Sequence, residues 1–80
     1  MTTVRVRLFA ALRELAGASE VQAEGATVGD VVVALSERYG ERFAKVARAG
    51  SVVVDGERVR SDRALAEGDE VALLPPVSGG

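Results

Sequence analysis

In five short stretches of the chain, hydrophobic and polar residues alternate or β-branched residues cluster, and both patterns predict β-strands. These stretches are residues 4–8, 20–24, 51–54, 57–60 and 70–74. In the first stretch, strict alternation places Val4, Val6 and Leu8 on the buried side. Asp55 and Gly56 lie between the third and fourth stretches, and this pair is typical of a tight β-hairpin.

A helical period replaces the alternation after Thr27. The Thr27 hydroxyl and the acidic Asp30 three positions later match the capping box of a helix N-terminus. A stripe of apolar residues follows at helical spacing, and Gly40 marks the end of this main helix. The stripe consists of Val28, Val31, Val32, Leu35 and Tyr39. Two shorter helical segments are predicted at residues 10–16 and 41–47. Their expected apolar contacts with the core are Leu12, Leu15, Phe43 and Val46.

The predicted elements follow the order strand, strand, main helix, strand, short strand, strand. A hairpin, a helix that crosses it and later strands that complete one mixed sheet form the β-grasp, or ubiquitin-like, fold of the α+β class. We therefore expect a mixed sheet of four to five strands packed on one main helix, with the other sheet face open to water. Residues 1–74 are expected to form this domain, and residues 75–80 an extended tail.

Composition and charge exclude several classes of function for this chain alone. The 80 residues include no Cys and no His, so thiolate nucleophiles, the usual neutral-pH base and the commonest zinc ligands are missing, and we expect no metal site. A net charge of −2 argues against nucleic-acid binding, which normally requires a basic excess. No apolar run approaches the roughly 18 residues of a membrane helix. With no signal-peptide pattern either, we expect a cytoplasmic protein without a membrane partner.

The last six residues, Pro75-Pro76-Val77-Ser78-Gly79-Gly80, differ from the rest of the chain. The prolines stiffen the start of this tail, the glycines free its end, and six extended residues reach about 20 Å. Because glycine has no Cβ, the terminal carboxylate can pass through a narrow channel into a partner. A carboxylate transfers its acyl group only after activation, for example as an acyl-adenylate, and the chain has no phosphate-binding loop for ATP. A separate enzyme would supply that chemistry, and the alternative is an inert chain end.

Four segments of the sequence resemble the small, sulfur-carrying subunits of molybdopterin synthase, which are ubiquitin-like sulfur carriers. These segments are residues 8–15, 27–28, 68–71 and 75–80. The resemblance covers the whole chain. The ending is its most discriminating part, because the similar carriers of the thiazole pathway usually lack the double proline.

The resemblance implies a sulfur carrier that is not an enzyme on its own and binds no cofactor itself. An E1-like adenylating enzyme would use ATP and Mg²⁺ to activate the Gly80 carboxylate, and a sulfur donor protein would convert it to a thiocarboxylate. The rest of the tail would lie in a channel of the large synthase subunit. There the terminal sulfur would be transferred to cyclic pyranopterin monophosphate, within a heterotetramer of two copies of each subunit.

The open sheet face beside the tail is the expected partner surface. Val71 and Leu73 point inward by parity, so Leu74 should point outward. Parity alone allows Phe9 either to turn into the core or to lie on the open face. The apolar patch that it would form there with Leu74 favours the open face, as a partner contact. Arg58 takes a position at which the resembled family commonly has an apolar residue. The arginines expected on this face, as partner contacts or as a solvated rim, are Arg5, Arg7, Arg58 and Arg60.

The same tail chemistry fits other functions. A sulfur carrier for thiazole, for a thiolated tRNA base or for cysteine would use the same thiocarboxylate. A protein modifier would instead join Gly80 to a lysine of its target through an isopeptide bond. An ordinary interaction domain would not need Gly80 at all.

Overall fold

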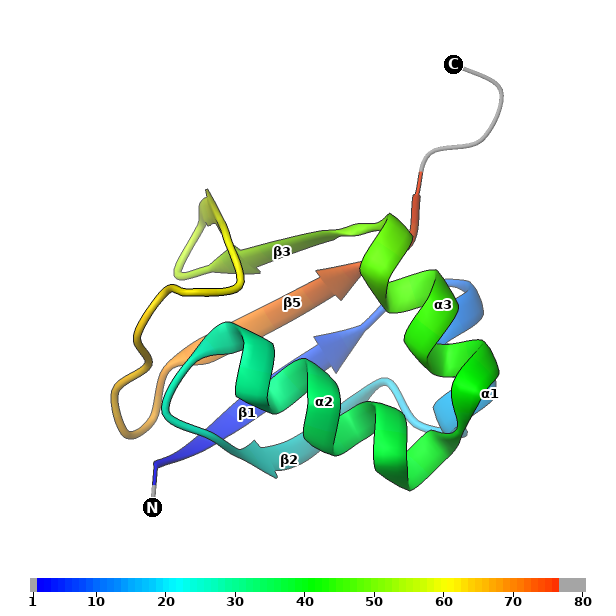
Figure 1. Cartoon of the computed structure of the whole chain (residues 1–80), viewed down its shortest axis with the longest axis horizontal. Coiled ribbons are helices and arrows are strands. Elements are labelled where there is room, and N and C mark those ends of the chain that lie inside the picture. Colours follow the sequence, from blue (N-terminus) through cyan, green and yellow to red (C-terminus); the bar gives the residue numbers. More distant parts are fainter. Residues whose placement is uncertain (1, 77–80) are drawn as a thin grey trace.

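The structure is a computed structural model that describes residues 2–76. A five-stranded mixed sheet has the strand order β2-β1-β5-β3-β4, and helix α2 lies across one of its faces (Figure 1). The strands are β1 (Thr3–Leu8), β2 (Glu20–Glu24), β3 (Ser51–Val54), β4 (Glu57–Val59) and β5 (Glu70–Leu74). The helices are α1 (Ala11–Ala16), α2 (Val28–Tyr39) and α3 (Glu41–Ala49). This is the α+β, β-grasp architecture that the sequence predicts.

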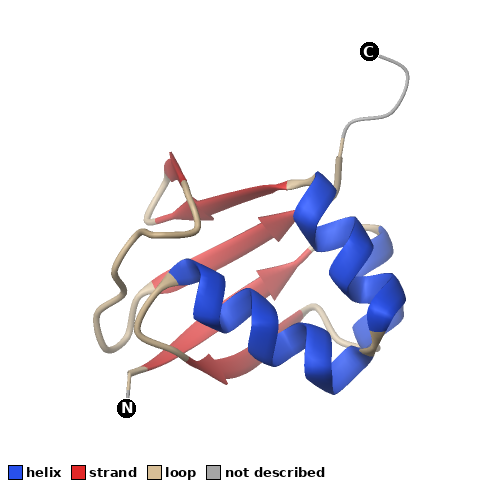
Figure 2. Ribbon diagram, in the orientation of Figure 1, coloured by secondary structure: helices blue, strands red, loops and turns tan. Residues whose placement is uncertain are grey.

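The first and last strands of the domain run parallel at the centre of the sheet, where Val6 pairs with Val71. β2 pairs antiparallel with β1, and β3 pairs antiparallel with both β5 and β4. The turn between β3 and β4 has positive φ at Asp55, 50°, and at Gly56, 85°, as a tight Asp-Gly hairpin requires. In Figure 2 the helices lie in front of the sheet and at one end of it.

Helix α2 begins where the sequence predicts. The Asp30 amide donates to Thr27 Oγ1 over 3.2 Å, and the Thr27 amide donates to Asp30 Oδ2 over 3.3 Å, so the capping box is complete. The Gly29 amide donates to the Ser61 carbonyl oxygen over 2.8 Å. The loop after β4 is therefore tied to the first turn of α2. Within residues 2–76, no helix is long and apolar enough to span a membrane.

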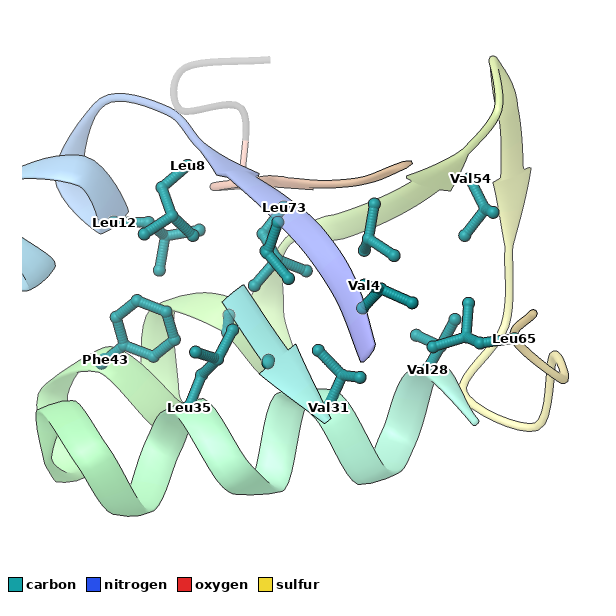
Figure 3. Packing of buried hydrophobic residues seen from close by; sticks show 14 residues of the cluster. Val4, Leu8, Leu12, Val28, Val31, Leu35, Phe43, Val54, Leu65 and Leu73 are labelled. Carbon is teal, nitrogen blue, oxygen red and sulfur yellow. The ribbon is translucent and has the colours of Figure 1, made fainter. Parts of the chain in front are cut away.

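The core lies between the sheet and the helices, and every residue buried in the described part of the chain is apolar (Figure 3). The buried strand residues are Val4, Val6, Leu8, Ala23, Val54, Val71 and Leu73. The other buried residues are Leu12, Val28, Val31, Leu35, Phe43, Ala44, Ala47 and Leu65. Burying one such valine or leucine contributes about 1.5–3 kcal/mol, so hydrophobic packing holds this small fold together.

Helix α3 is longer than the sequence predicts. The domain therefore contains more helix than the expected architecture of one main helix on a sheet. The sequence predicts a segment at residues 41–47 with Val46 buried, but α3 extends to Ala49 and Val46 is only half-buried. Phe43 is buried as predicted, and Ala44 and Ala47 complete the inner face of α3. Small alanine side chains allow α3 to pack closely on the other two helices. Because alanines replace large apolar residues on this face, the sequence shows no stripe of large apolar residues that would predict it.

Candidate functional site: the root of the tail and the open sheet face

The tail leaves the domain from the central strand β5 (Figure 1). The strand ends at Leu74, Pro75 is half-buried and Pro76 is exposed. Neither proline can donate a ladder hydrogen bond, so the strand ends here, as the sequence predicts. The other residues of the predicted tail, including the acyl terminus, lie outside the described residues; they are Val77, Ser78, Gly79 and Gly80.

Gly50 fixes the path of the backbone at the root of the tail. It precedes Ser51, which pairs with Leu74 in the antiparallel register of β3 and β5. A Cβ on Gly50 would overlap the Leu74 carbonyl oxygen and would come within 3.1 Å of the carbonyl carbon of Pro75. Only glycine lets the two backbones approach this closely. Sequence reasoning missed this residue, because the contact joins segments far apart in the chain.

Phe9 and Leu74 directly follow the last residue pair of the parallel register between β1 and β5, which is Leu8 and Leu73. Because Leu73 is buried, Leu74 points to the sheet face away from α2. Phe9 is 37% exposed and Leu74 is half-buried. Phe9 therefore does not turn into the core, which was the other possibility that parity allowed.

Two smaller residues extend this apolar surface toward β3. Val53 and Ala72 pair with each other on the same face, and both are half-buried. We call the four residues the tail-side patch: Phe9, Val53, Ala72 and Leu74. Exposed apolar side chains gathered on one surface are typical of a partner contact. That Phe9 and Leu74 bind a partner remains a prediction, supported by where they lie.

Arg58 borders the tail-side patch at the edge of the sheet. It is exposed and lies opposite Val53 in the register of β3 and β4. Its Nη2 atom donates to Ser51 Oγ over 2.9 Å. This hydrogen bond keeps a positive charge close to the strand residue that pairs with Leu74.

The arginines of β1 occupy a different part of the open face. Arg5 lies next to Glu70 of β5, and Arg7 lies opposite Glu20 of β2. In the sheet register Arg5 and Arg7 thus lie across from acidic residues, whereas Arg58 lies across from the uncharged Val53. Of these three arginines, Arg58 is the best placed to meet a negative charge on a partner.

The described residues near the root of the tail are mainly apolar. Within residues 2–76, no three acidic side chains lie close enough together to hold a metal ion. The Ser51 hydroxyl and the Arg58 guanidinium lie near the root of the tail and bind each other.

Comparisons with known proteins agree with this arrangement. The model of the ThiS family matches residues 6–80. The chain is 38% identical to small archaeal modifier protein 1 of Haloferax volcanii, over 92% of this chain and 97% of that protein. It is 37% identical to the molybdopterin synthase sulfur carrier subunit of Escherichia coli, over 96% and 99% respectively. A chain of the BexX/CysO complex of Amycolatopsis orientalis is 30% identical and superposes with a TM-score of 0.80, over 96% and 99%.

These similar proteins share both the size and the fold of this chain. Each match spans nearly the whole of both molecules, and the structural neighbours are ubiquitin-like β-grasp proteins. By its name, one relative is a subunit of a larger enzyme, and another was solved together with a second protein. The relatives are thus small carriers that work with partners. This chain belongs to the ThiS family of ubiquitin-like sulfur carriers.

Proposed function

We propose that this chain carries sulfur as a thiocarboxylate on Gly80 and donates it in molybdopterin synthesis. The observation that carries the proposal is the root of the tail: Pro75 and Pro76 follow the central strand β5, and the exposed Phe9 follows the neighbouring strand β1 at the same end of the sheet. The Gly-Gly ending and the similarity to the sulfur carrier subunit of Escherichia coli support it. Together they favour an acyl terminus presented next to a docking surface.

The first half of the proposed cycle loads the tail. An E1-like adenylating enzyme, with ATP and Mg²⁺, joins AMP to the Gly80 carboxylate and releases pyrophosphate. A sulfur donor protein then supplies sulfur at the oxidation level of sulfide, a C–S bond replaces the bond to AMP, and AMP leaves. The chain's own contribution to this step is steric: the prolines stiffen the start of the tail, and glycine, which has no Cβ, leaves the reacting carboxyl group unhindered. Because loading consumes ATP, we expect it to take place in the cytoplasm.

The second half of the cycle unloads the tail in the large subunit of molybdopterin synthase. The tail-side patch and Arg58 dock on that subunit, and residues 75–79 lie in its channel. The sulfur of the thiocarboxylate passes to cyclic pyranopterin monophosphate, and Gly80 becomes a carboxylate again with oxygen from water. Two copies of each subunit form a heterotetramer, and the catalytic side chains belong to the large subunit.

Intact-mass measurement after co-expression tests the loading step. With the adenylating enzyme and sulfur donor present, we expect the chain to gain the mass of one sulfur in place of one oxygen. The loaded chain, mixed with the large subunit and cyclic pyranopterin monophosphate, should yield molybdopterin. Deleting Gly80 should abolish both results without lowering the Tm, because the core lies elsewhere. A loaded chain that produces no molybdopterin would refute the assigned pathway.

A second candidate function is suggested by the modifier protein of Haloferax volcanii. In this case the activated Gly80 would be attacked by a lysine of a target protein and would form an isopeptide bond. The two functions share the activation step and differ in its product. Conjugates of higher mass that survive reducing agents, with a glycine remnant on the target lysine, would identify the modifier function.

A further inference from the structure

A cleft of about 460 Å³ lies on the helix side of the sheet, on the half that α2 leaves uncovered. Helix α2 packs toward β2, at the opposite edge of the sheet from β4 (Figure 1). The first half of α2, the end of α3, β3, β4 and the loop after β4 form the walls of the cleft. Concave sites of this size are large enough to receive a side chain or a short segment of another molecule.

Valines form the apolar lining of the cleft. Val33 of α2 is 51% exposed, and Val32, Val52 and Val59 are half-buried. They come from three elements that converge without filling the space between them. An apolar concavity of this kind is where an anchor side chain of a partner protein binds most strongly.

The charged side chains among the described residues of the cleft are both arginines. Arg48 comes from the last turn of α3, and Arg58 comes from β4. The hydrogen bond from Arg58 to Ser51 Oγ, 2.9 Å long, holds one of these guanidinium groups at the cleft. The whole chain carries a net charge of −2, so this positive surface contrasts with the rest of the molecule.

We propose that the cleft docks an acidic segment of a partner protein around one bulky apolar side chain. The apolar side chain fills the space between the valines, and flanking carboxylates pair with Arg48 and Arg58. Charge complementarity favours acidic over basic segments, and the cleft lining offers no aromatic ring on which a nucleic-acid base could stack. The cleft lies on the helix side of the sheet, and Leu74 lies on the other face. Arg58 borders both surfaces, so the test variants are made at Arg48 and Val33, which the function proposed for the tail does not use.

A labelled peptide provides a direct test with the full chain. The probe is an acetylated nonapeptide, Asp-Glu-Asp-Leu-Phe-Leu-Asp-Glu-Asp, with binding measured by fluorescence anisotropy and mapped through backbone amide signals in NMR. We expect saturable binding that weakens as salt is added, with shifts at Val33, Arg48 and Val52. Two control peptides replace every acidic residue by lysine, or the three apolar residues by serine. Each control should bind at least tenfold more weakly.

Variants of the chain locate the binding energy. Arg48→Glu and Val33→Asp change exposed side chains, and each should weaken binding of the acidic peptide at least tenfold, which corresponds to about 1.4 kcal/mol. Arg42→Glu is the matched control, because Arg42 is exposed on the same helix but does not line the cleft, and it should bind normally.

Three results would overturn the proposal. The first is equal affinity for the acidic and lysine peptides, or no binding at all. The second is a set of amide shifts at Phe9 and Leu74 in place of the cleft. The third is evidence that something else occupies the cleft. The occupant would be the tail if removing residues 77–80 shifts the amide signals of the cleft in the absence of peptide. It would be a second copy of the chain if the chain sediments as a dimer that Val33→Asp dissociates.

Discussion

Replacing Gly50 by alanine tests whether the close backbone approach at the root of the tail holds β5 and the tail in place. The new Cβ would overlap the Leu74 carbonyl oxygen and would lie 2.9 Å from the carbonyl carbon of the same residue. A flexible side chain could rotate away from such an overlap, but a backbone carbonyl in a paired strand cannot. Either β3 or the end of β5 must therefore move.

The size of the effect follows from the identity of the obstructing atoms. Overpacking in a well-packed region costs about 1–3 kcal/mol, and we expect about 2–3 kcal/mol here because backbone must shift. The total stability expected for a domain of this length is about 4–12 kcal/mol, so the variant should fold but with a reduced margin. At about 4–8 °C per kcal/mol, its Tm should fall by about 10–20 °C.

Thermal unfolding and tail loading are measured together, with Gly17→Ala as the control. Gly17 has a φ of 75°, and a Cβ there would have no neighbouring atom within 4 Å, so alanine adds left-handed backbone strain of about 1–2 kcal/mol without a clash. We expect the control to lose stability but to be thiocarboxylated at the normal rate. Gly50→Ala should lose both stability and loading rate. If Gly50→Ala keeps the Tm and the loading rate of the wild type, the reasoning is wrong.

Three further substitutions test other parts of the molecule. Leu74→Asp should raise the Kd for the large subunit at least tenfold, which corresponds to about 1.4 kcal/mol and can be measured by calorimetry. An unchanged Kd would exclude Leu74 from the interface. Thr27→Ala removes the hydroxyl that accepts a hydrogen bond from the Asp30 amide, and it should lower the free energy of unfolding in urea by about 1 kcal/mol. An unchanged free energy of unfolding would show that the cap contributes little. Phe43→Ala, at a fully buried position, should cost about 3–5 kcal/mol, and a cooperative transition at the wild-type Tm would contradict the packing of this core.

The strands could be predicted from the sequence because one sheet face is buried, which imposes a period of two. Val4, Val6 and Leu8 are buried as that pattern requires. Phe9 was ambiguous because parity does not say where a strand ends. The chain turns after it at Ala10, which has a φ of 50°, and a non-glycine residue in that conformation gives no signal in the sequence.

Other parts of the site depend on tertiary packing and left no pattern along the chain. The end of β5 could be predicted from the two prolines that follow it, but the role of Gly50 depends on a strand that approaches it from elsewhere. In the same way, Val33 reads as one valine in a run of three. Its exposure arises because α2 packs toward one edge of the sheet and leaves the other uncovered.

The central position of β5 links presentation of the chain end to completion of folding. β5 fills the gap between β1 and β3, and it is the last strand of the domain to be synthesised. The pairing of β5 with β1, in which Glu70 lies opposite Arg5, joins the two ends of the domain. Forming contacts between segments so far apart in the sequence is a slow step in folding. A nascent or truncated chain lacks both this strand and the terminus that follows it. An activating enzyme that recognises the finished sheet beside the tail would therefore spend ATP only on carriers that have passed through folding.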